Sequence, residues 1–171
     1  GYIKVLDTCR ISKVKHRIGF LPENPEFLKN ISAYEILKFS LKISGLPFDR
    51  QRIPDTLEKV KLYDERNEKV KNFSKGMRQR IGIAQAIIHS PELLILDEPM
   101  SGLDPPGRRM VIDIIEEYYH QGKTVLFSTH NLDDIEALCT DVIVTNKGEI
   151  QLEKSIPELR EKSNFRIAVH E

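Results

Sequence analysis

Two adjacent acids, Asp97 and Glu98, are the residues of this chain best suited to chemistry. They follow Leu-Leu-Ile-Leu at positions 93–96, an apolar run typical of a parallel strand that is covered on both faces. In open α/β sheets, ligands bind outside the carboxyl ends of the strands. Successive strand residues face opposite ways, so the two carboxylates need not share one task. The pattern favours a site in which one acid holds a metal ion and the other handles a proton.

An amphipathic helix is predicted immediately before this strand. Ser74 is a residue type that caps helix N-termini, and it marks the expected start. Apolar residues then recur on one helical face, at Ile81, Ala84, Ile87 and Ile88. Ser90 and Pro91 end the pattern after His89, because a proline disfavours helical geometry in the residue before it. The helix and the strand are therefore expected to be joined by a short loop.

Four short motifs in this region resemble, in order and spacing, those of the nucleotide-binding domain of ATP-binding cassette (ABC) proteins. FSKGMRQR at 73–80 resembles the signature motif, LLILDEP at 93–99 the Walker B strand, SGLD at 101–104 the D-loop, and STH at 128–130 the segment with the switch histidine. Each motif alone is weak, but all four together are specific. The resemblance implies a P-loop NTPase-type α/β fold, with a mostly parallel sheet flanked by helices and an inserted all-helical subdomain at residues 30–90. It makes residues 1–162 a partial nucleotide-binding domain, with residues 163–171 as the start of a possible C-terminal extension.

The resemblance also implies roles for the signature motif and the D-loop. Ser74, Lys75 and Gly76 would bind ATP that is held by a partner domain, with the serine hydroxyl on the γ-phosphate and the helix N-terminus facing the anion. Asp104 would lie near the nucleotide and communicate between the two domains. Met77 stands where the family has a glutamine, and it cannot make the hydrogen bonds of that side chain.

The hydrolytic residues are implied in the same way. Asp97 would hold magnesium, and Glu98 would orient or deprotonate the attacking water. His130 would hold the γ-phosphate. Glu23 occupies the position of the Q-loop glutamine, so it keeps an oxygen ligand for magnesium and adds a charge. The alternative for Glu23 is a surface acid in a proline-rich turn.

A second triplet, Gly122-Lys123-Thr124, matches the end of a Walker A motif. The first glycine of such a motif would stand at the position of Glu117, which lies in a predicted helix, and residues 125–127 are predicted to form a strand. A phosphate-binding loop leads from a strand into a helix, so that backbone N–H groups converge on the phosphates. The triplet is therefore predicted to end a helix and to precede a strand.

By the family's order, the Walker A motif belongs before Gly1. We therefore expect the chain to be a piece of a longer protein rather than a naturally degenerate one. The Walker A backbone and its lysine supply most of the nucleotide affinity of P-loop proteins. Residues 1–171 alone are accordingly expected to bind ATP weakly or not at all, and to be inactive.

The other elements expected from local patterns surround this region. Ser32 and Glu35 form a capping box that opens a helix ending near Gly45. A second helical segment within residues 47–62 is expected to start near Asp49 and to be disturbed or restarted at Pro54. The remaining helices are predicted from an N-terminus at Pro105-Pro106 through the apolar stripe of 109–121, from Asn131 or Asp133 to Leu138, and over 155–162. The remaining strands are predicted over 2–6, 17–21, 124–128 and 165–169, with a hairpin joining 141–145 to 148–152.

The composition is that of one globular domain. The chain has 171 residues with 40% hydrophobic content, enough to bury a core. Lys plus Arg and Asp plus Glu both number 26, so the charge balance does not point to a nucleic acid partner. The sequence shows no apolar run as long as a membrane span and no leader pattern. We expect a cytoplasmic protein, and two separate cysteines, Cys9 and Cys139, fit a reducing compartment.

The resemblance implies two partners. A second nucleotide-binding domain would pair head to tail with this one. A transmembrane permease subunit would contact residues 24–28, with Asn24, Pro25, Phe27 and Leu28 as candidates, and would hold the chain at the cytoplasmic face of the membrane. The alternative is that Phe27 and Leu28 close the local core.

Three functions therefore stay open. The first is the ATP-hydrolysing subunit of an ABC transporter, of an export type, with ATP and magnesium as cofactors. The second is a soluble ABC-type ATPase of translation or DNA repair, although too few residues separate Glu23 from Ser74 for a long coiled coil. The third is a non-catalytic fragment of the fold, against which the retained Glu98 and His130 count.

Overall fold

The computed structural model describes residues 2–47 and 49–161. The chain divides into two compact units, residues 1–128 and 129–171. The strand predicted over 165–169 and the extension predicted over 163–171 lie outside the described residues.

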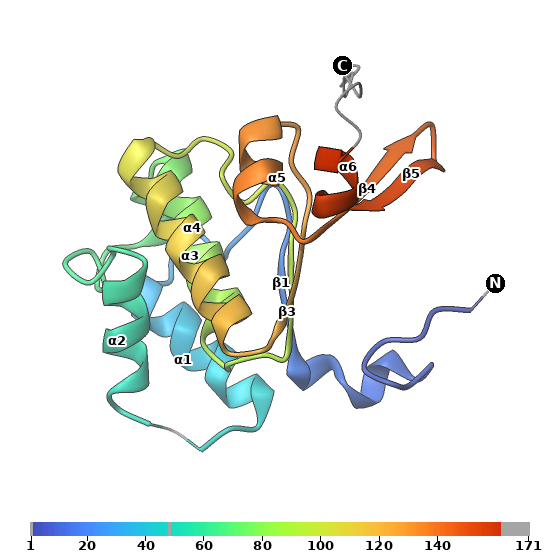
Figure 1. Ribbon diagram of the computed structural model, residues 1–171. Coiled ribbons are helices and arrows are strands. Elements are labelled where there is room, and N and C mark those ends of the chain that lie inside the picture. The colour runs from blue at the N-terminus through green and yellow to red at the C-terminus, as the bar shows by residue number, and fades with distance from the viewer. Residues whose placement is uncertain (1, 48, 162–171) are drawn as a thin grey trace. The chain divides into compact units, whose positions relative to one another are not determined.

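A three-stranded parallel sheet forms one layer of the first unit (Figure 1). Its strands are β1 (Ile18–Leu21), β2 (Leu93–Leu96) and β3 (Thr124–Phe127), in the order β1-β2-β3. The register places Leu21 beside Leu96 and Leu96 beside Phe127 at the carboxyl ends. Parallel neighbours need crossover connections, which helices supply here. The α/β class expected from the sequence is confirmed.

Three α-helices and a 3-10 helix lie between β1 and β2. They are α1 (Ala33–Ser44), α2 (Arg52–Lys59), η3 (Val70–Asn72) and α3 (Lys75–Ile87). The predicted capping box opens α1, and Gly45 ends it in the left-handed conformation at φ 73°. The second helix starts at Arg52 rather than near Asp49, because Pro54 falls in its first turn, where a missing N–H leaves no helical bond unmade. Thus Pro54 is accommodated rather than disruptive.

The helix before the acids is nearly as predicted. Ser74 caps α3, and its side chain accepts a hydrogen bond from the Met77 N–H at 3.2 Å. The helix ends at Ile87 rather than His89, since Ser90 takes a positive φ of 53° and turns the chain toward β2. The loop between α3 and β2 is therefore short, as expected.

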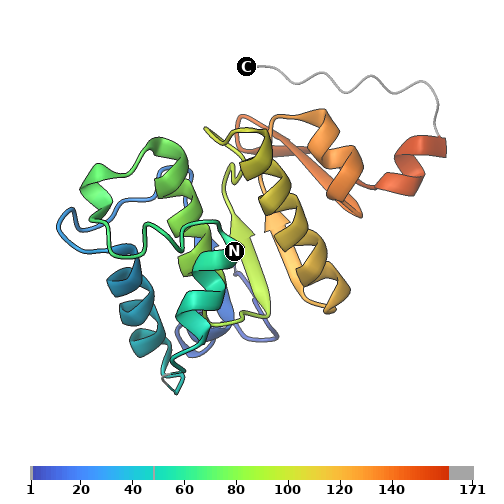
Figure 2. The ribbon, with the colours of Figure 1, turned by 90° about the vertical axis from the view of Figure 1, so that its left-hand side faces the viewer.

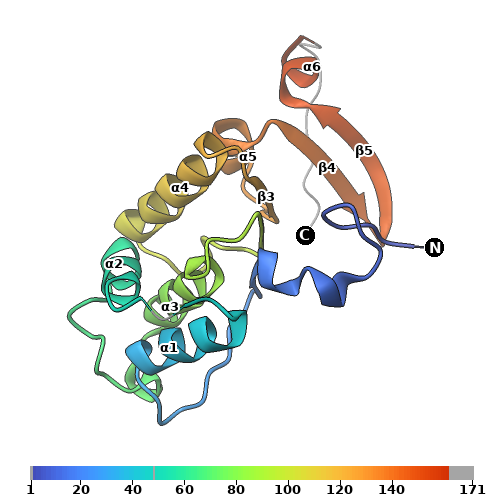
Figure 3. The same ribbon diagram turned by 90° about the horizontal axis from the view of Figure 1, so that it is seen from below.

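One face of the sheet is covered by α3 and by α4 (Pro105–His120), which lie on the same side of it in Figures 2 and 3. Leu21, Leu94 and Leu96 are buried beneath them. On the other face, Phe20 is 58% and Leu126 56% exposed. The prediction that the strand at 93–96 is covered on both faces is therefore met only in part among the described residues: Leu94 and Leu96 are buried, whereas Leu93 and Ile95 on the other face are half-buried.

The predicted strand over 2–6 is not formed. The backbones of Val5 and Thr8 instead bond to each other across a tight turn, with Leu6 and Asp7 at φ 47° and 63°. Tyr2 is 85% exposed. Two 3-10 helices, η1 (Ile11–Lys13) and η2 (Lys15–Arg17), then lead to β1. An alternating pattern forms a strand only beside a partner backbone, and within the described residues this segment pairs with itself.

The second unit contains α5 (Leu132–Leu138), an antiparallel hairpin of β4 (Asp141–Asn146) and β5 (Glu149–Ser155), and α6 (Ile156–Glu161). The predicted hairpin is confirmed. Its turn residues Lys147 and Gly148 both have positive φ, at 50° and 79°, which matches the twist of the flanking strands. Lys162, the predicted end of α6, lies outside the described residues.

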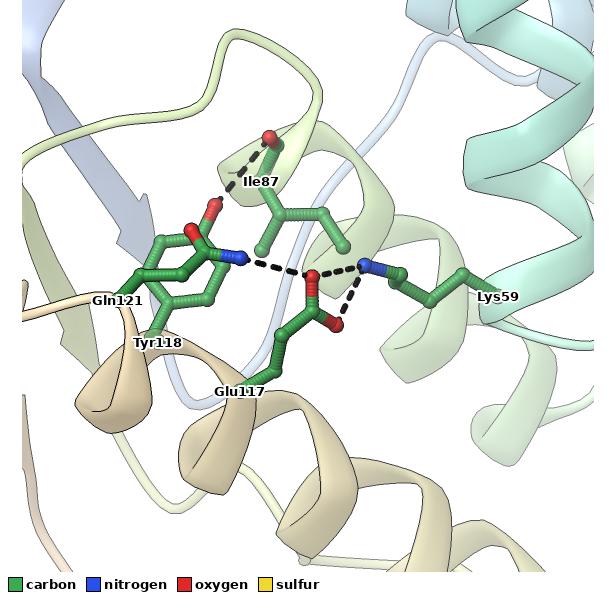
Figure 4. A network of polar contacts seen from close by, with 5 residues as sticks. All are labelled: Lys59, Ile87, Glu117, Tyr118 and Gln121. Atoms are coloured by element: carbon green, nitrogen blue, oxygen red, sulfur yellow. Dashed lines mark hydrogen bonds and ion pairs between the residues drawn. The ribbon is translucent and has the colours of Figure 1, made fainter.

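A polar network joins α2 to the helices that cover the sheet (Figure 4). The Lys59 ammonium donates to both carboxylate oxygens of Glu117, at 2.8 and 2.6 Å, and the Gln121 amide donates to one of them at 3.1 Å. The hydroxyl of Tyr118 donates to the carbonyl of Ile87 at 3.4 Å, and burial raises the pKa of this tyrosine. The ion pair is partly exposed and contributes at most about 1 kcal/mol. Buried Ile53 and Leu57 therefore hold α2 more firmly than the network does.

Within residues 2–47 and 49–161, none of the helices combines the length and the apolar character needed to cross a membrane.

Close packing of α3 on β1 depends on Gly19, and this can be tested. A Cβ at Gly19 would lie 2.2 Å from the backbone oxygen of Ala86. We expect Gly19→Ala to lower the free energy of unfolding by about 3 kcal/mol, because the obstacle is backbone. Gly45→Ala is the matched control: its φ of 73° is strained but nothing lies within 4 Å, so about 1 kcal/mol is expected. Equal losses in chemical denaturation would contradict the steric explanation.

Candidate functional site

The two acids lie where the sequence predicted them, at the carboxyl edge of the sheet. The Asp97 N–H continues the β1 pairing by donating to the Leu21 carbonyl at 2.9 Å. One oxygen of the Asp97 carboxylate accepts a hydrogen bond from the Ser128 hydroxyl at 2.6 Å. Because Asp97 is exposed, its remaining oxygen lone pairs face a place that a ligand can reach. Ser128 follows β3, so two neighbouring strands build this contact.

The backbone of Glu98 is held in an unusual conformation. Its φ is 45°, in the left-handed region that a side chain larger than glycine rarely adopts. The Glu98 N–H donates to the Ser128 hydroxyl oxygen at 2.9 Å. The Glu98 carbonyl accepts from the Gln79 amide at 3.2 Å and from the Ser101 N–H at 3.0 Å. Hydrogen bonds on both sides therefore hold the backbone of Glu98, whose side chain is half-buried.

Sequence reasoning singled out neither Gln79 nor Ser128 as a site residue. Ser128 opens the segment 128–130, but the resemblance gave a role in that segment to His130 alone. In the sequence, Gln79 is a polar residue in the middle of a predicted helix, and such a residue usually faces solvent. In the structure it is only 2% exposed. Only its burial shows that its amide must have partners inside the protein.

The signature residues meet the predicted D-loop. Lys75 reaches the Ser101 hydroxyl at 3.5 Å. A Cβ at Gly76 would lie 3.3 Å from the carbonyl oxygen of Gly102, so a larger residue would press on this turn. Ser74 is exposed at the helix N-terminus while its hydroxyl oxygen accepts the capping bond from Met77. The start of α3 is thus open to solvent and packed against residues 101–102.

Asp104 has two structural partners in this chain. It caps α4 by accepting from the Gly107 N–H at 3.1 Å, and it pairs with the Arg80 guanidinium at 2.7 Å. Partial desolvation opposes ionisation, but the hydrogen bond and charge of Arg80 and the cap hold the pKa of Asp104 below its usual value. The carboxylate therefore ties α3 to the start of α4, whatever else it does.

The predicted metal ligands are exposed oxygen donors. Within the described residues, no three His, Cys, Asp or Glu side chains converge as a metal cluster. Mg²⁺ commonly takes one or two carboxylates and completes its shell with water and substrate phosphates. Asp97 fits that mode. Glu23 is exposed and lies two residues beyond the end of β1. Because β1 and β2 are parallel neighbours, Glu23 and Asp97 both follow the carboxyl edge of the sheet.

His130 belongs to the second unit, in the turn that leads into α5. It is exposed. Asn131 caps α5, its own N–H donates to the Thr129 hydroxyl oxygen at 3.1 Å, and Thr129 donates to Asp134 at 3.3 Å. The backbone on both sides of the histidine is therefore ordered by local hydrogen bonds.

Two further predictions can be compared with the structure. Gly122 ends α4 with φ 70°, and Thr124 starts β3, so the glycine-lysine-threonine triplet is a helix end and not a phosphate loop, as predicted.

In the segment 24–28, Leu28 is 74% exposed and Phe27 half-buried. Leu28 therefore does not close the local core, which removes that alternative for this residue.

Comparisons with known proteins agree with the resemblance to ABC nucleotide-binding domains. The family model described as ABC transporter matches residues 2–101. The uncharacterized ABC transporter ATP-binding protein YxlF of Bacillus subtilis is 38% identical over 169 residues, 98% of this chain and 56% of that protein. The linearmycin resistance ATP-binding protein LnrL of Bacillus subtilis is 34% identical, covering 88% of this chain and 48% of that protein.

A third relative, the bacitracin transport ATP-binding protein BcrA of Enterococcus faecalis, is 36% identical over 86% of this chain and 48% of its own length. This chain spans about half the length of these curated relatives. A solved structure of the ATP binding subunit of an ABC transporter matches with a TM-score of 0.88 at 25% identity, over 98% of this chain and 72% of that one. The P-loop NTPase-type α/β fold is thereby confirmed.

The two structural bonds of Asp104 can be separated by substitution. Asp104→Asn keeps a capping oxygen but loses the charge that pairs with Arg80, whereas Asp104→Ala loses both. We expect Asp104→Ala to lower the melting temperature clearly and Asp104→Asn to lower it only slightly. If differential scanning calorimetry gave equal shifts, the cap would not be the stabilising contact.

Proposed function

This chain belongs to the ABC transporter family, and on that premise we propose that it forms part of the ATP-binding subunit of a membrane transporter and hydrolyses ATP when joined to a Walker A motif. The observation that carries the proposal is the pair of acids at the end of β2, oriented by Ser128 and Gln79. The residues around the pair do not need such acids for packing, and Asp97 is exposed.

Hydrolysis assigns different tasks to the two acids. Asp97, with its free oxygen lone pairs, would hold the magnesium ion that accompanies ATP, and Glu23 would add an oxygen from the neighbouring strand end. When bound, that ion supplies neutralising charge to the phosphates. Glu98 would accept a proton from water as the water oxygen bonds to the γ-phosphorus. The bond from that phosphorus to the bridging oxygen breaks, and ADP leaves with the electron pair.

His130 would complete the hydrolytic set. Its imidazole can donate a hydrogen bond to a γ-phosphate oxygen and stabilise the charge that is transferred. The place of His130 in the segment STH at 128–130 supports this role.

The exposed start of α3 supports pairing with a second nucleotide-binding domain, head to tail. Ser74, Lys75 and Gly76 would face ATP held by the partner, with the serine hydroxyl and the helix N-terminus on the γ-phosphate. Asp104, next to this turn, would transmit the contact between the two domains.

A transmembrane permease would be the other partner, and it would hold the chain at the cytoplasmic face of the membrane. Exposed Leu28 supports a contact through residues 24–28, since a large apolar side chain at 74% exposure lacks a partner surface among the described residues. The direction proposed is export. Relatives named for linearmycin resistance and bacitracin transport support it.

The role of Glu98 is tested in the full-length protein by Glu98→Gln. The amide cannot accept the proton of the attacking water, so we expect kcat to fall by at least about 100-fold. ATP binding, followed by fluorescence of a labelled nucleotide, should be unchanged. Hydrolysis at the wild-type rate would remove Glu98 from this role.

The role of Ser74 is tested by two changes, of which the first preserves its cap. Ser74→Asp keeps an N-capping oxygen but places a negative charge against the phosphate, and Ser74→Arg blocks the position with a large side chain. Both should abolish ATP-dependent dimerisation in light scattering. Ser32→Asn is the control: its amide offers an oxygen to cap α1 and an N–H to the Glu35 carboxylate, at a position outside the signature motif, and it should dimerise normally. Unchanged dimerisation of both Ser74 variants would refute the assignment.

A further inference from the structure

We propose that Gln79 and Ser128 are positioning residues, which clamp the backbone of Glu98 from both sides and so aim its carboxylate at the attacking water. The inference rests on the proposed role of Glu98 as the proton acceptor. It adds two side chains that act through the peptide groups around Glu98: Gln79 from the core and Ser128 from the exposed end of β3.

The first side of the clamp is Ser128. The Glu98 N–H can only donate, so the Ser128 oxygen must accept from it at 2.9 Å. The hydroxyl proton is then directed to Asp97, at an oxygen–oxygen distance of 2.6 Å. One hydroxyl therefore sets the position of the Glu98 backbone and the rotamer of the Asp97 carboxylate together. A bond to an ionised acceptor is stronger than a neutral one, which makes the chain of two bonds directional.

The second side is Gln79. Its side-chain nitrogen lies 3.2 Å from the Glu98 carbonyl oxygen and 3.2 Å from the Pro99 carbonyl oxygen. Gln79 is 2% exposed, in the part of α3 that faces the core. Two N–H groups on one amide match two successive carbonyls, and a buried amide is retained only where such partners exist.

The conformation between the two contacts explains why a clamp is needed. Glu98 has φ 45°, a strained backbone for a residue with a Cβ. Pro99 follows directly and disfavours helical geometry at Glu98. Without contacts on its N–H and carbonyl, this peptide would relax toward an extended conformation and turn the carboxylate away. A strained backbone conformation persists where several neighbouring contacts hold it. Here the contacts come from Gln79 in α3 and from Ser128 after β3.

The test uses the full-length protein and two conservative changes, Gln79→Met and Ser128→Ala. Each should lower the kcat of ATP hydrolysis about 10- to 100-fold, the usual effect of removing a supporting contact, with KM for ATP within about twofold of wild type. The Mg²⁺ concentration for half-maximal rate should rise severalfold in Ser128→Ala, because Ser128 also holds Asp97, and should stay unchanged in Gln79→Met. Ser128→Thr keeps the hydroxyl and should restore the rate.

Controls separate this role from general damage. Gln121→Met and Ser40→Ala remove the same groups at positions away from Glu98 and should leave all three parameters unchanged. The double variant Gln79→Met with Ser128→Ala should lose less than the product of the single losses, because both act on one peptide. If Gln79→Met fails to fold, the contrast between Ser128→Ala and Ser128→Thr decides the proposal.

Two outcomes would overturn the clamp. One is wild-type kcat in both single variants while Glu98→Gln is inactive, which leaves the proposed function standing. The other is a rise in KM and in the Mg²⁺ requirement to the same extent in both variants, which indicates a loosened fold. By contrast, wild-type hydrolysis by Glu98→Gln would mean that the proposed function itself had failed.

Discussion

The parallel register of β2 with β3 is the constraint on which the candidate site depends. Because Leu96 lies beside Phe127, the next residues along each strand, Asp97 and Ser128, emerge side by side. Their hydrogen bond of 2.6 Å is a consequence of that register. A slip of one residue would turn every side chain of the strand to the opposite face and separate the serine from the acid. The chemistry therefore rests on strand pairing before it rests on any polar contact.

Close approach of α3 to the sheet is the second condition. Gly19 in β1 and Gly82 in α3 remove the side chains that would hold the two apart: a Cβ at Gly82 would lie 2.6 Å from Leu21. Only with the helix at this depth does Gln79 reach the carbonyls that follow β2. Ser74 caps the N-terminus of the same helix. One rigid element therefore contacts the backbone of Glu98 through Gln79 and also carries the residues proposed to face a second nucleotide.

Several residues have a structural and a proposed chemical role at once. Ser74 and Asp104 each cap a helix, and Asp104 also pairs with Arg80. Capping oxygens and ligand-binding groups gather at the same places, since the N-terminus of a helix has unpaired N–H groups and a positive dipole end. Changes at such positions are informative only when the cap is kept, which is why substitutions that keep a capping oxygen separate the two roles better than alanine does.

The sequence alone determined much of this protein. Apolar periodicity and capping residues located α1, α3, α4, β2 and the hairpin of the second unit, because these signals are local. The order of the motifs identified the family and the acids Asp97 and Glu98. The tertiary structure decided what depends on distant partners: residues 2–6 form no strand, since strand formation requires a neighbouring backbone, and the sheet is covered on one face. It also decided the positions of Gln79 and Ser128 around Glu98, since contacts between residues far apart in sequence arise only when the helix and the strands have packed.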